Sequence, residues 1–162
     1  MKNEKLRGVF EGLSFQNVQS VISSGNILFE SDETDTTALE EKAEKAFPSK
    51  LGFTCTTIIR SQNQLKELVK LDPFKSYTHG PTSYLLVTFF KYPTKTQFNI
   101  PHRPEGKPYK FIAATPKTLF STTDNTVLTT TDLMGWLERR FGKQITSRTW
   151  LTVHRILKRM NS

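Results

Sequence analysis

The stretch from Gln16 to Glu30 constrains the fold more strongly than any other part of the chain. Its sequence, QNVQSVISSGNILFE, holds two short β-prone runs, Val18–Ile22 and Ile27–Glu30. The tetrapeptide Ser23-Ser24-Gly25-Asn26 separates them, and Gly and Asn are the residues that most readily accept positive φ in a tight turn. The stretch therefore predicts a β-hairpin at the centre of a small α+β unit.

Helical patterns flank this hairpin on both sides. A helix is predicted over residues 3–13, where Asn3 can cap, and a second from Thr37, which forms a capping box with Glu40. A strand is predicted over 53–60, and Ser61-x-x-Gln64 predicts the start of a third helix, which ends at Asp72-Pro73. The order α-β-β-α-β-α matches the β-α-β-β-α-β order of a ferredoxin-like unit without its first strand.

The second half predicts another mixture of strands and helices. The near-continuous apolar run Tyr84–Phe90 is typical of a central strand that is covered on both faces. Further strands, a long loop over 94–107 and two helices follow. The strands are predicted at 109–114, 118–121 and 126–128, the helices at 132–141 and 148–160, with Thr146 or Ser147 capping the last helix. We therefore expect an α+β fold.

The charges are unevenly distributed along the 162 residues, whose formal net charge is +8. Residues 1–71 carry 9 Lys and Arg against 10 Asp and Glu, whereas residues 72–162 carry 14 against 5. From Arg139 to the end there are seven basic residues and no acidic one. This asymmetry predicts a surface that attracts nucleic acid or another polyanion; the alternative is a basic, solvated surface without a partner.

Two groups of residues are candidates for anion binding. Arg148, Thr152, Arg155 and Arg159 recur at helical spacing, and arginine forks suit phosphate oxygens; the alternative is a solvated basic face. The turn residues Ser24, Gly25 and Asn26 could offer backbone N–H groups to an anion, but such tetrapeptides are more often simple turns.

The sequence lacks the spacings that mark most cofactor, metal and nucleophile sites. His79, His102 and His154 show no metal-ligand spacing, and no phosphate-binding glycine loop or G-x-S-x-G frame occurs. The lone Cys55 excludes an internal disulfide framework and is typical of a buried small hydrophobe. We therefore expect no metal and no cofactor.

The hydrophobic segments predict a cytoplasmic protein. The longest apolar run is too short to span a bilayer, and the N-terminal residues lack the apolar core of a signal peptide.

Several aromatic residues near lysines could stack on bases, but core packing is the commoner role of such residues. They are Phe89, Phe90, Tyr92, Tyr109 and Phe111.

Three blocks of the sequence resemble a bacterial family, domain-of-unknown-function family sixteen ninety-seven. Gly12–Glu30 is similar to its "lGf-nV-t-i-SGN-vF" block, Leu65–Phe74 to its "eL…v…nPF" block, and Met134–Leu157 to its T-x-R-x-W-x-T block. The resemblance implies two ferredoxin-like halves, 1–78 and 79–162, in one globular unit, and no established activity.

Family members usually begin with a strand and an R-G-[IV]-N-V-G-G-like loop, which this chain lacks. We expect an uncovered sheet edge, with which a second copy could pair.

Three functions are compatible with these observations. The first is a noncatalytic domain that binds nucleic acid or another polyanion through the basic C-terminal half. The second is a structural or interaction domain that self-associates without a polyanion. The third is a phosphate-substrate enzyme that uses Ser24-Gly25-Asn26 and Arg148.

Overall fold

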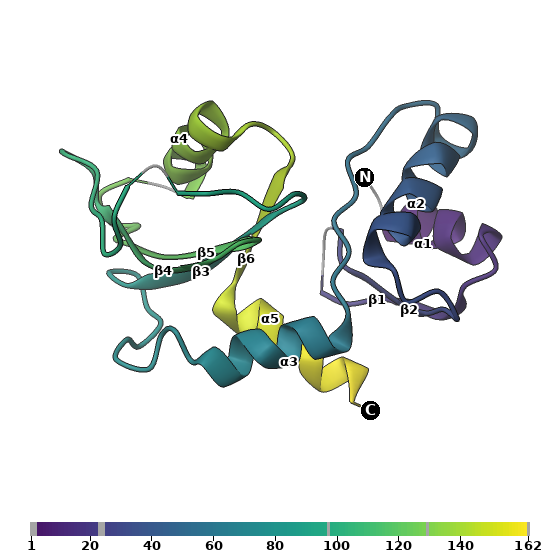
Figure 1. The fold of residues 1–162 in the computed structure, drawn as a ribbon, viewed down its shortest axis with the longest axis horizontal. Helices are drawn as coiled ribbons and strands as arrows, with labels where there is room; N and C mark the ends of the chain where they lie inside the picture. The colour runs from purple at the N-terminus through teal and green to yellow at the C-terminus, as the bar shows by residue number, and fades with distance from the viewer. Residues whose placement is uncertain (1–2, 23–24, 97, 129, 162) are drawn as a thin grey trace. The chain divides into compact units, whose positions relative to one another are not determined.

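The computed structural model describes residues 3–22, 25–96, 98–128 and 130–161, which form helices and two antiparallel sheets (Figure 1). The mixture confirms the predicted α+β fold. Its elements, in chain order, are α1 (Asn3–Gly12), β1 (Gln16–Ser20), β2 (Ile27–Glu30), α2 (Thr36–Leu51), α3 (Gln62–Leu71), β3 (Tyr84–Phe90), β4 (Tyr109–Thr115), β5 (Thr118–Thr123), α4 (Thr130–Phe141), β6 (Ile145–Thr149) and α5 (Trp150–Met160).

The chain divides into two compact units. Unit 1 comprises Met1–Gln64 with Ile156–Ser162, and unit 2 comprises Leu65–Arg155. The expected halves 1–78 and 79–162 do not coincide with these units, because α3 and α5 each contribute residues to both. In the described part of the chain, no helix combines the length and the apolar character needed to cross a membrane.

Unit 1 is built on the predicted hairpin. Strands β1 and β2 pair antiparallel, with Ser20 opposite Ile27, and α1 and α2 lie on the same side of them (Figure 1). Strand β1 starts two residues earlier than predicted and contains a bulge at Asn17, whose φ is 50°. The buried core of this unit lies between helices and hairpin, and consists of Val9, Phe10, Phe15, Leu39, Ala43 and Phe47.

Helix α2 begins one residue earlier than the sequence indicates. Asp35, not Thr37, is its N-cap, and the Asp35 carboxylate accepts the N–H of Thr37. The helix continues through Pro48 and ends at Gly52, whose φ of 79° suits a residue without a side chain. By contrast, α3 starts where Ser61-x-x-Gln64 predicts, and these two residues form a capping box, because each side chain accepts the other's backbone N–H.

Residues 53–60 form no strand, although the sequence predicts one. The composition of this segment is β-prone, but a strand is defined by hydrogen bonds to a neighbouring strand, and none pairs with it in the described residues. The prediction failed because it used composition alone.

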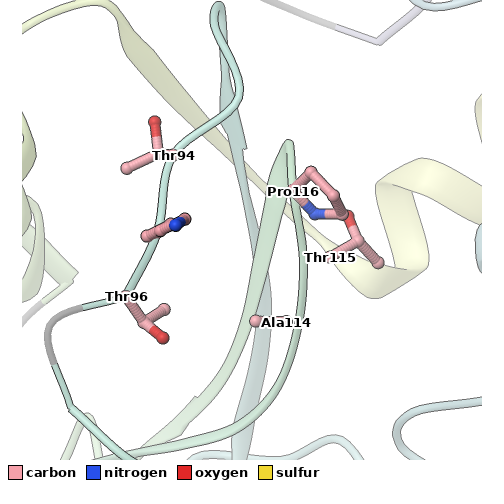
Figure 2. Close-up of a pocket in the computed structure, with 6 residues that line it drawn as sticks. Thr94, Thr96, Ala114, Thr115 and Pro116 are labelled. Atoms are coloured by element: carbon pink, nitrogen blue, oxygen red, sulfur yellow. The ribbon is translucent and has the colours of Figure 1, made fainter.

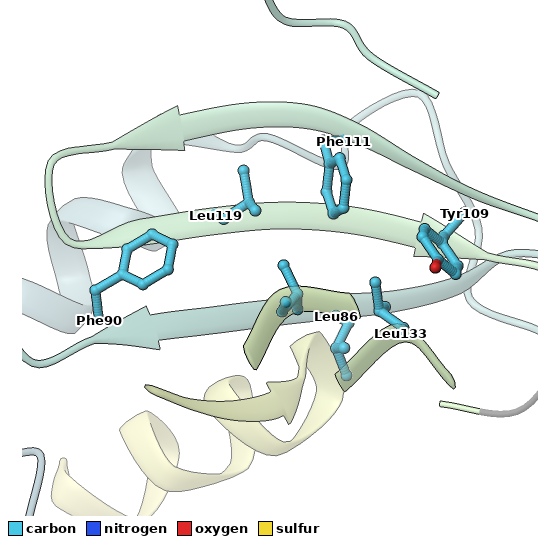
Figure 3. Close-up of a cluster of buried hydrophobic side chains, with 7 residues drawn as sticks. Leu86, Phe90, Tyr109, Phe111, Leu119 and Leu133 are labelled. Atoms are coloured by element: carbon cyan, nitrogen blue, oxygen red, sulfur yellow. The ribbon is translucent and has the colours of Figure 1, made fainter. Parts of the chain in front are cut away.

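Unit 2 contains a four-stranded sheet in the order β4-β5-β3-β6, with every neighbouring pair antiparallel. One face carries a buried cluster shared with α4 (Figure 3), which consists of Leu86, Phe90, Tyr109, Phe111, Leu119, Leu133 and Leu137. On the other face, Phe120 packs against Phe74 and Trp150, with ring centroids 5.7 and 6.0 Å away. Both faces of this sheet are therefore covered, as the run Tyr84–Phe90 predicted.

Two other predictions in unit 2 are wrong. The predicted strand 126–128 is a turn, because β5 extends to Thr123 and the Asp124 carboxylate then accepts the N–H of Thr126. The predicted start of the last helix is strand β6, in which Arg148 lies opposite Val87 of β3. The label "ferredoxin-like" for the two halves stays a prediction.

Candidate anion-binding site

The backbone of the hairpin turn already donates a hydrogen bond to another side chain of the protein, that of Asn3. Gly25 adopts a φ of 84° and donates its N–H to Oδ1 of Asn3 across 3.1 Å, while Nδ2 of Asn3 donates to the carbonyl of Ile22. Asn26 is buried, and its carbonyl accepts the N–H of Val21. Ser24 lies outside the described residues. An anion would therefore have to displace the side chain of Asn3 to reach the Gly25 N–H.

Arg148 does not belong to the predicted helical stripe. It lies in β6, where successive side chains alternate between the two faces of the sheet. The direction of the Arg148 side chain therefore does not follow the 3.6-residue repeat of helix α5. Its Nη1 donates to Oγ1 of Thr146 and to the carbonyl of Ser147, both across 2.8 Å. Burial lowers the pKa of the Arg148 guanidinium from its ordinary value. The side chain is therefore partly engaged inside its own strand.

Thr152 lies in the capped first turn of α5. Oγ1 of Thr149 accepts the Thr152 N–H across 3.1 Å and donates to Oγ1 of Thr152. Thr149 thus occupies the N-cap position that the sequence assigned to Thr146 or Ser147. The first N–H groups of a helix have no acceptor within the helix. At this end, Thr149 supplies an acceptor for one of them, the N–H of Thr152.

Arg155 and Arg159 are both exposed and lie four residues apart on α5. Nε of Arg159 donates to Oε1 of Gln19 in β1 across 3.0 Å. The apolar side chains of this helix form part of the core, because Trp150, Val153 and Leu157 are buried.

The structure does not gather the predicted residues into one compact unit. Gly25, Asn26 and Arg159 belong to unit 1, whereas Arg148, Thr152 and Arg155 belong to unit 2. The enzyme hypothesis requires the turn and Arg148 to form one site. Neither unit contains both, so this pairing stays a prediction.

A second basic group, not singled out from the sequence, lies where α4 ends. Arg139, Arg140 and Lys143 are all exposed. The Arg140 guanidinium lies over the ring of Trp136, 4.7 Å from its centroid. A tryptophan followed by an arginine four residues later on a helix is the sequence signal for this contact.

The aromatic candidates mostly belong to the core. Phe89, Phe90, Tyr109 and Phe111 are buried, so core packing is the correct interpretation for these four, whereas Tyr92 is exposed. The Tyr109 hydroxyl donates to Asp132, and burial raises its pKa well above the ordinary value, with the Asp132 hydrogen bond and charge adding to the rise.

No metal site is evident in the described residues. They contain no group of three or more His, Cys, Asp and Glu side chains that could hold a metal ion. One hollow is lined by Thr94, Lys95, Thr96, Ala114, Thr115 and Pro116 (Figure 2). This lining includes no carboxylate, histidine or cysteine, so the hollow itself offers no acid–base pair.

Comparison with known proteins identifies a family of unknown function and a solved structure of similar fold. A solved structure, described as the conserved bacterial protein SP0830 from Streptococcus pneumoniae, is similar in fold, with a TM-score of 0.68 and 18% sequence identity. The match covers 100% of this chain and 90% of that one. No curated protein matches. The model of a family described as protein of unknown function, DUF1697, matches residues 1–115, and the chain belongs to this family.

Proposed function

We propose that this protein is a noncatalytic domain that binds nucleic acid or another polyanion through unit 2. The supporting observation is the distribution of charge between the two units. Unit 2 carries 14 Lys and Arg against 6 Asp and Glu, whereas unit 1 carries 9 of each, so the whole formal net charge of +8 belongs to unit 2. A cytoplasmic location is part of this proposal.

The cations of unit 2 are mostly available to solvent. Nine of its basic residues are exposed, against four exposed acidic ones, Glu67, Asp72, Glu105 and Glu138. Exposed cations release the counterions of a nucleic acid when they contact its phosphates, which is the main source of nonspecific affinity. The exposed basic residues are Lys66, Lys70, Lys75, Lys95, Arg103, Arg139, Arg140, Lys143 and Arg155.

The topology of unit 2 favours electrostatic binding rather than base stacking on the sheet. Its strand order, β6-β3-β5-β4, corresponds to a ferredoxin-like sheet in which residues 91–108 replace the first helix, and we interpret the unit in this way. RNA-binding domains of related topology stack bases on an open sheet face. Here both faces are covered by side chains and helices, so we expect phosphate contacts and little sequence preference.

The test is the salt dependence of binding to a labelled single-stranded RNA and a duplex DNA, followed by fluorescence anisotropy. We expect the logarithm of the association constant to fall linearly with the logarithm of NaCl concentration, by about 0.7 per phosphate contact for a single strand. A complete lack of binding at low salt would remove the proposal.

Charge-reversal variants locate the surface. The triple variant Arg139→Glu, Arg140→Glu, Lys143→Glu should weaken binding and reduce the salt slope. The matched control, Lys5→Glu, Lys45→Glu, Lys50→Glu, makes the same change in net charge on exposed residues of unit 1. It should reduce binding much less. Equal losses in both variants would contradict a site on unit 2.

A further inference from the structure

The ring of Trp136, in α4, is held in place by three other aromatic rings. Its centroid lies 5.1 Å from that of Phe111 and 6.1 Å from those of Tyr109 and Phe98. Phe111 and Tyr109 belong to the buried cluster of unit 2, whereas Trp136 is only partly buried. Closely packed side chains keep one orientation, so the indole offers a fixed surface at the boundary of the core.

The guanidinium of Arg140 covers this ring. Its Cζ lies over the indole of Trp136, 4.7 Å from the ring centroid. Side chains four residues apart share one face of a helix and lean toward its N-terminus, which brings Arg140 back over Trp136. A planar guanidinium that stacks on an aromatic ring has a second face for another partner. Arg140 is exposed, which leaves its outer side accessible to a ligand.

Arg140 belongs to a group of exposed cations at the end of α4. Arg139 precedes it and lies back along the helix, since its Nη1 would be only 3.2 Å from a Cβ atom placed at Gly135. Lys143 follows the end of the helix. Within the described residues, no ion pair involves any of these three cations, although Glu138 is close in sequence. Their charge is therefore available to an anionic ligand.

A stacking plane distinguishes single strands from duplexes. In a duplex, each base is covered on both faces by its neighbours, whereas the unpaired bases of a single strand can stack on aromatic rings or on arginine planes. Arg140 over Trp136 presents a plane of this kind beside cations that suit phosphate oxygens. A duplex could use the cations but not the plane.

We propose that unit 2 binds single-stranded nucleic acid, with one unpaired base stacked on the outer face of the Arg140 guanidinium. This inference rests on the proposed function of unit 2 and names its substrate class. Trp136 holds the guanidinium in place, and Arg139 and Lys143 bind neighbouring phosphates. Every base has a π face, so the stack adds affinity without selecting a sequence.

The test compares two labelled probes of about 12 nucleotides, a length within the range of single-strand binding sites. One is a strand of thymidines, and the other has the same sugar-phosphate backbone with every base missing. Fluorescence anisotropy at low salt gives both dissociation constants. The wild-type protein should bind the thymidine strand at least about fivefold more tightly, which is the lower end of the contribution of one stacked base.

Two adjacent exposed arginines provide matched variants. Arg140→Lys keeps the charge but removes the planar guanidinium, so it should reduce the preference for the thymidine strand to less than about twofold. Arg139→Lys makes the same chemical change beside it and should keep the preference. Each preference is a ratio measured on one protein, so the folded fraction of a variant cancels. A duplex DNA should bind the wild type and Arg140→Lys equally.

The outcomes separate this inference from the proposed function. Equal binding of the two probes by the wild type overturns base stacking and leaves polyanion binding in place. Loss of the preference in both variants, or in neither, overturns the role of Arg140. An equal loss for duplex and single strand in Arg140→Lys overturns the assignment to unpaired bases. No binding of either probe or of the duplex at low salt overturns this inference together with the proposed function.

Discussion

The carboxylate of Glu40 and the guanidinium of Arg60 form an ion pair inside unit 1, with 3.7 Å between Oε2 and Nη1 and side chains only 3% and 8% exposed. The same carboxylate oxygen accepts the N–H of Ile59, and Nη1 donates to the Ile59 carbonyl. Burial lowers the pKa of Arg60, and Glu40 partly offsets this effect. The pair therefore anchors the unpaired segment 53–60 to α2.

Removing one member of this pair should be costly. Glu40→Ala leaves the Arg60 charge buried without this partner, and we expect a loss of about 3–5 kcal/mol in the free energy of unfolding, measured in urea. Glu41→Ala, at the adjacent exposed position, should change it by less than about 0.5 kcal/mol. The double variant Glu40→Leu, Arg60→Met should recover most of the loss. Equal stabilities of Glu40→Ala and Glu41→Ala would contradict a buried pair.

The N-cap of α2 gives a second prediction. Asp35→Ala removes the acceptor of the Thr37 N–H and should cost about 1 kcal/mol of unfolding free energy. Thr37→Ala, at the position that the sequence favoured, should cost clearly less. Chemical denaturation of the two variants measures the difference, and the reverse order would restore Thr37 as the cap.

Arg148 and Arg155 should respond differently to replacement. Arg148→Ala removes hydrogen bonds within β6 and should cost about 1–2 kcal/mol of stability, with little change in the salt slope of RNA binding. Arg155→Ala, at an exposed position, should change stability by less than about 0.5 kcal/mol. It should reduce the slope by about 0.7 if it contacts one phosphate. A salt slope that is reduced by Arg148→Ala but not by Arg155→Ala would mean that Arg148, and not Arg155, contacts phosphate.

The reactivity of Cys55 gives a fourth prediction. Burial, and then the negative charge of Glu44, raise the pKa of this thiol above its ordinary value. A higher pKa means less thiolate at a given pH, so the pH midpoint of alkylation by iodoacetamide should lie above that of the urea-unfolded chain. Glu44→Gln should lower the midpoint but leave it above the unfolded value, because burial remains. A midpoint at or below the unfolded value would contradict this environment.

Local signals predicted part of the structure correctly. The turn around Gly25 predicts the hairpin because positive φ is a property of the residue itself. The capping box of Ser61 and Gln64 predicts the start of α3 because its two hydrogen bonds span only three residues. The apolar run Tyr84–Phe90 predicts a strand covered on both faces because continuous hydrophobicity requires burial on two sides.

The candidate site was predicted less well, and Arg148 is the instructive example. Its spacing to Thr152 and Arg155 fits a helix, and only pairing with β3 places it in a strand. The basic residues were visible in the sequence, but their assignment to unit 2, and the contact of Arg140 with Trp136, depend on how distant segments pack.

The sequence alone determined the hairpin turn, the helix start at Ser61, the burial of β3 and the excess of positive charge, because each depends on neighbouring residues or on composition. The tertiary structure decided which β-prone segments became strands. Residues 145–149 did so because β3 offers them a free edge, and residues 53–60 did not because no strand in the described residues pairs with them. A strand is completed by hydrogen bonds to a distant segment, and that information is absent from its own residues.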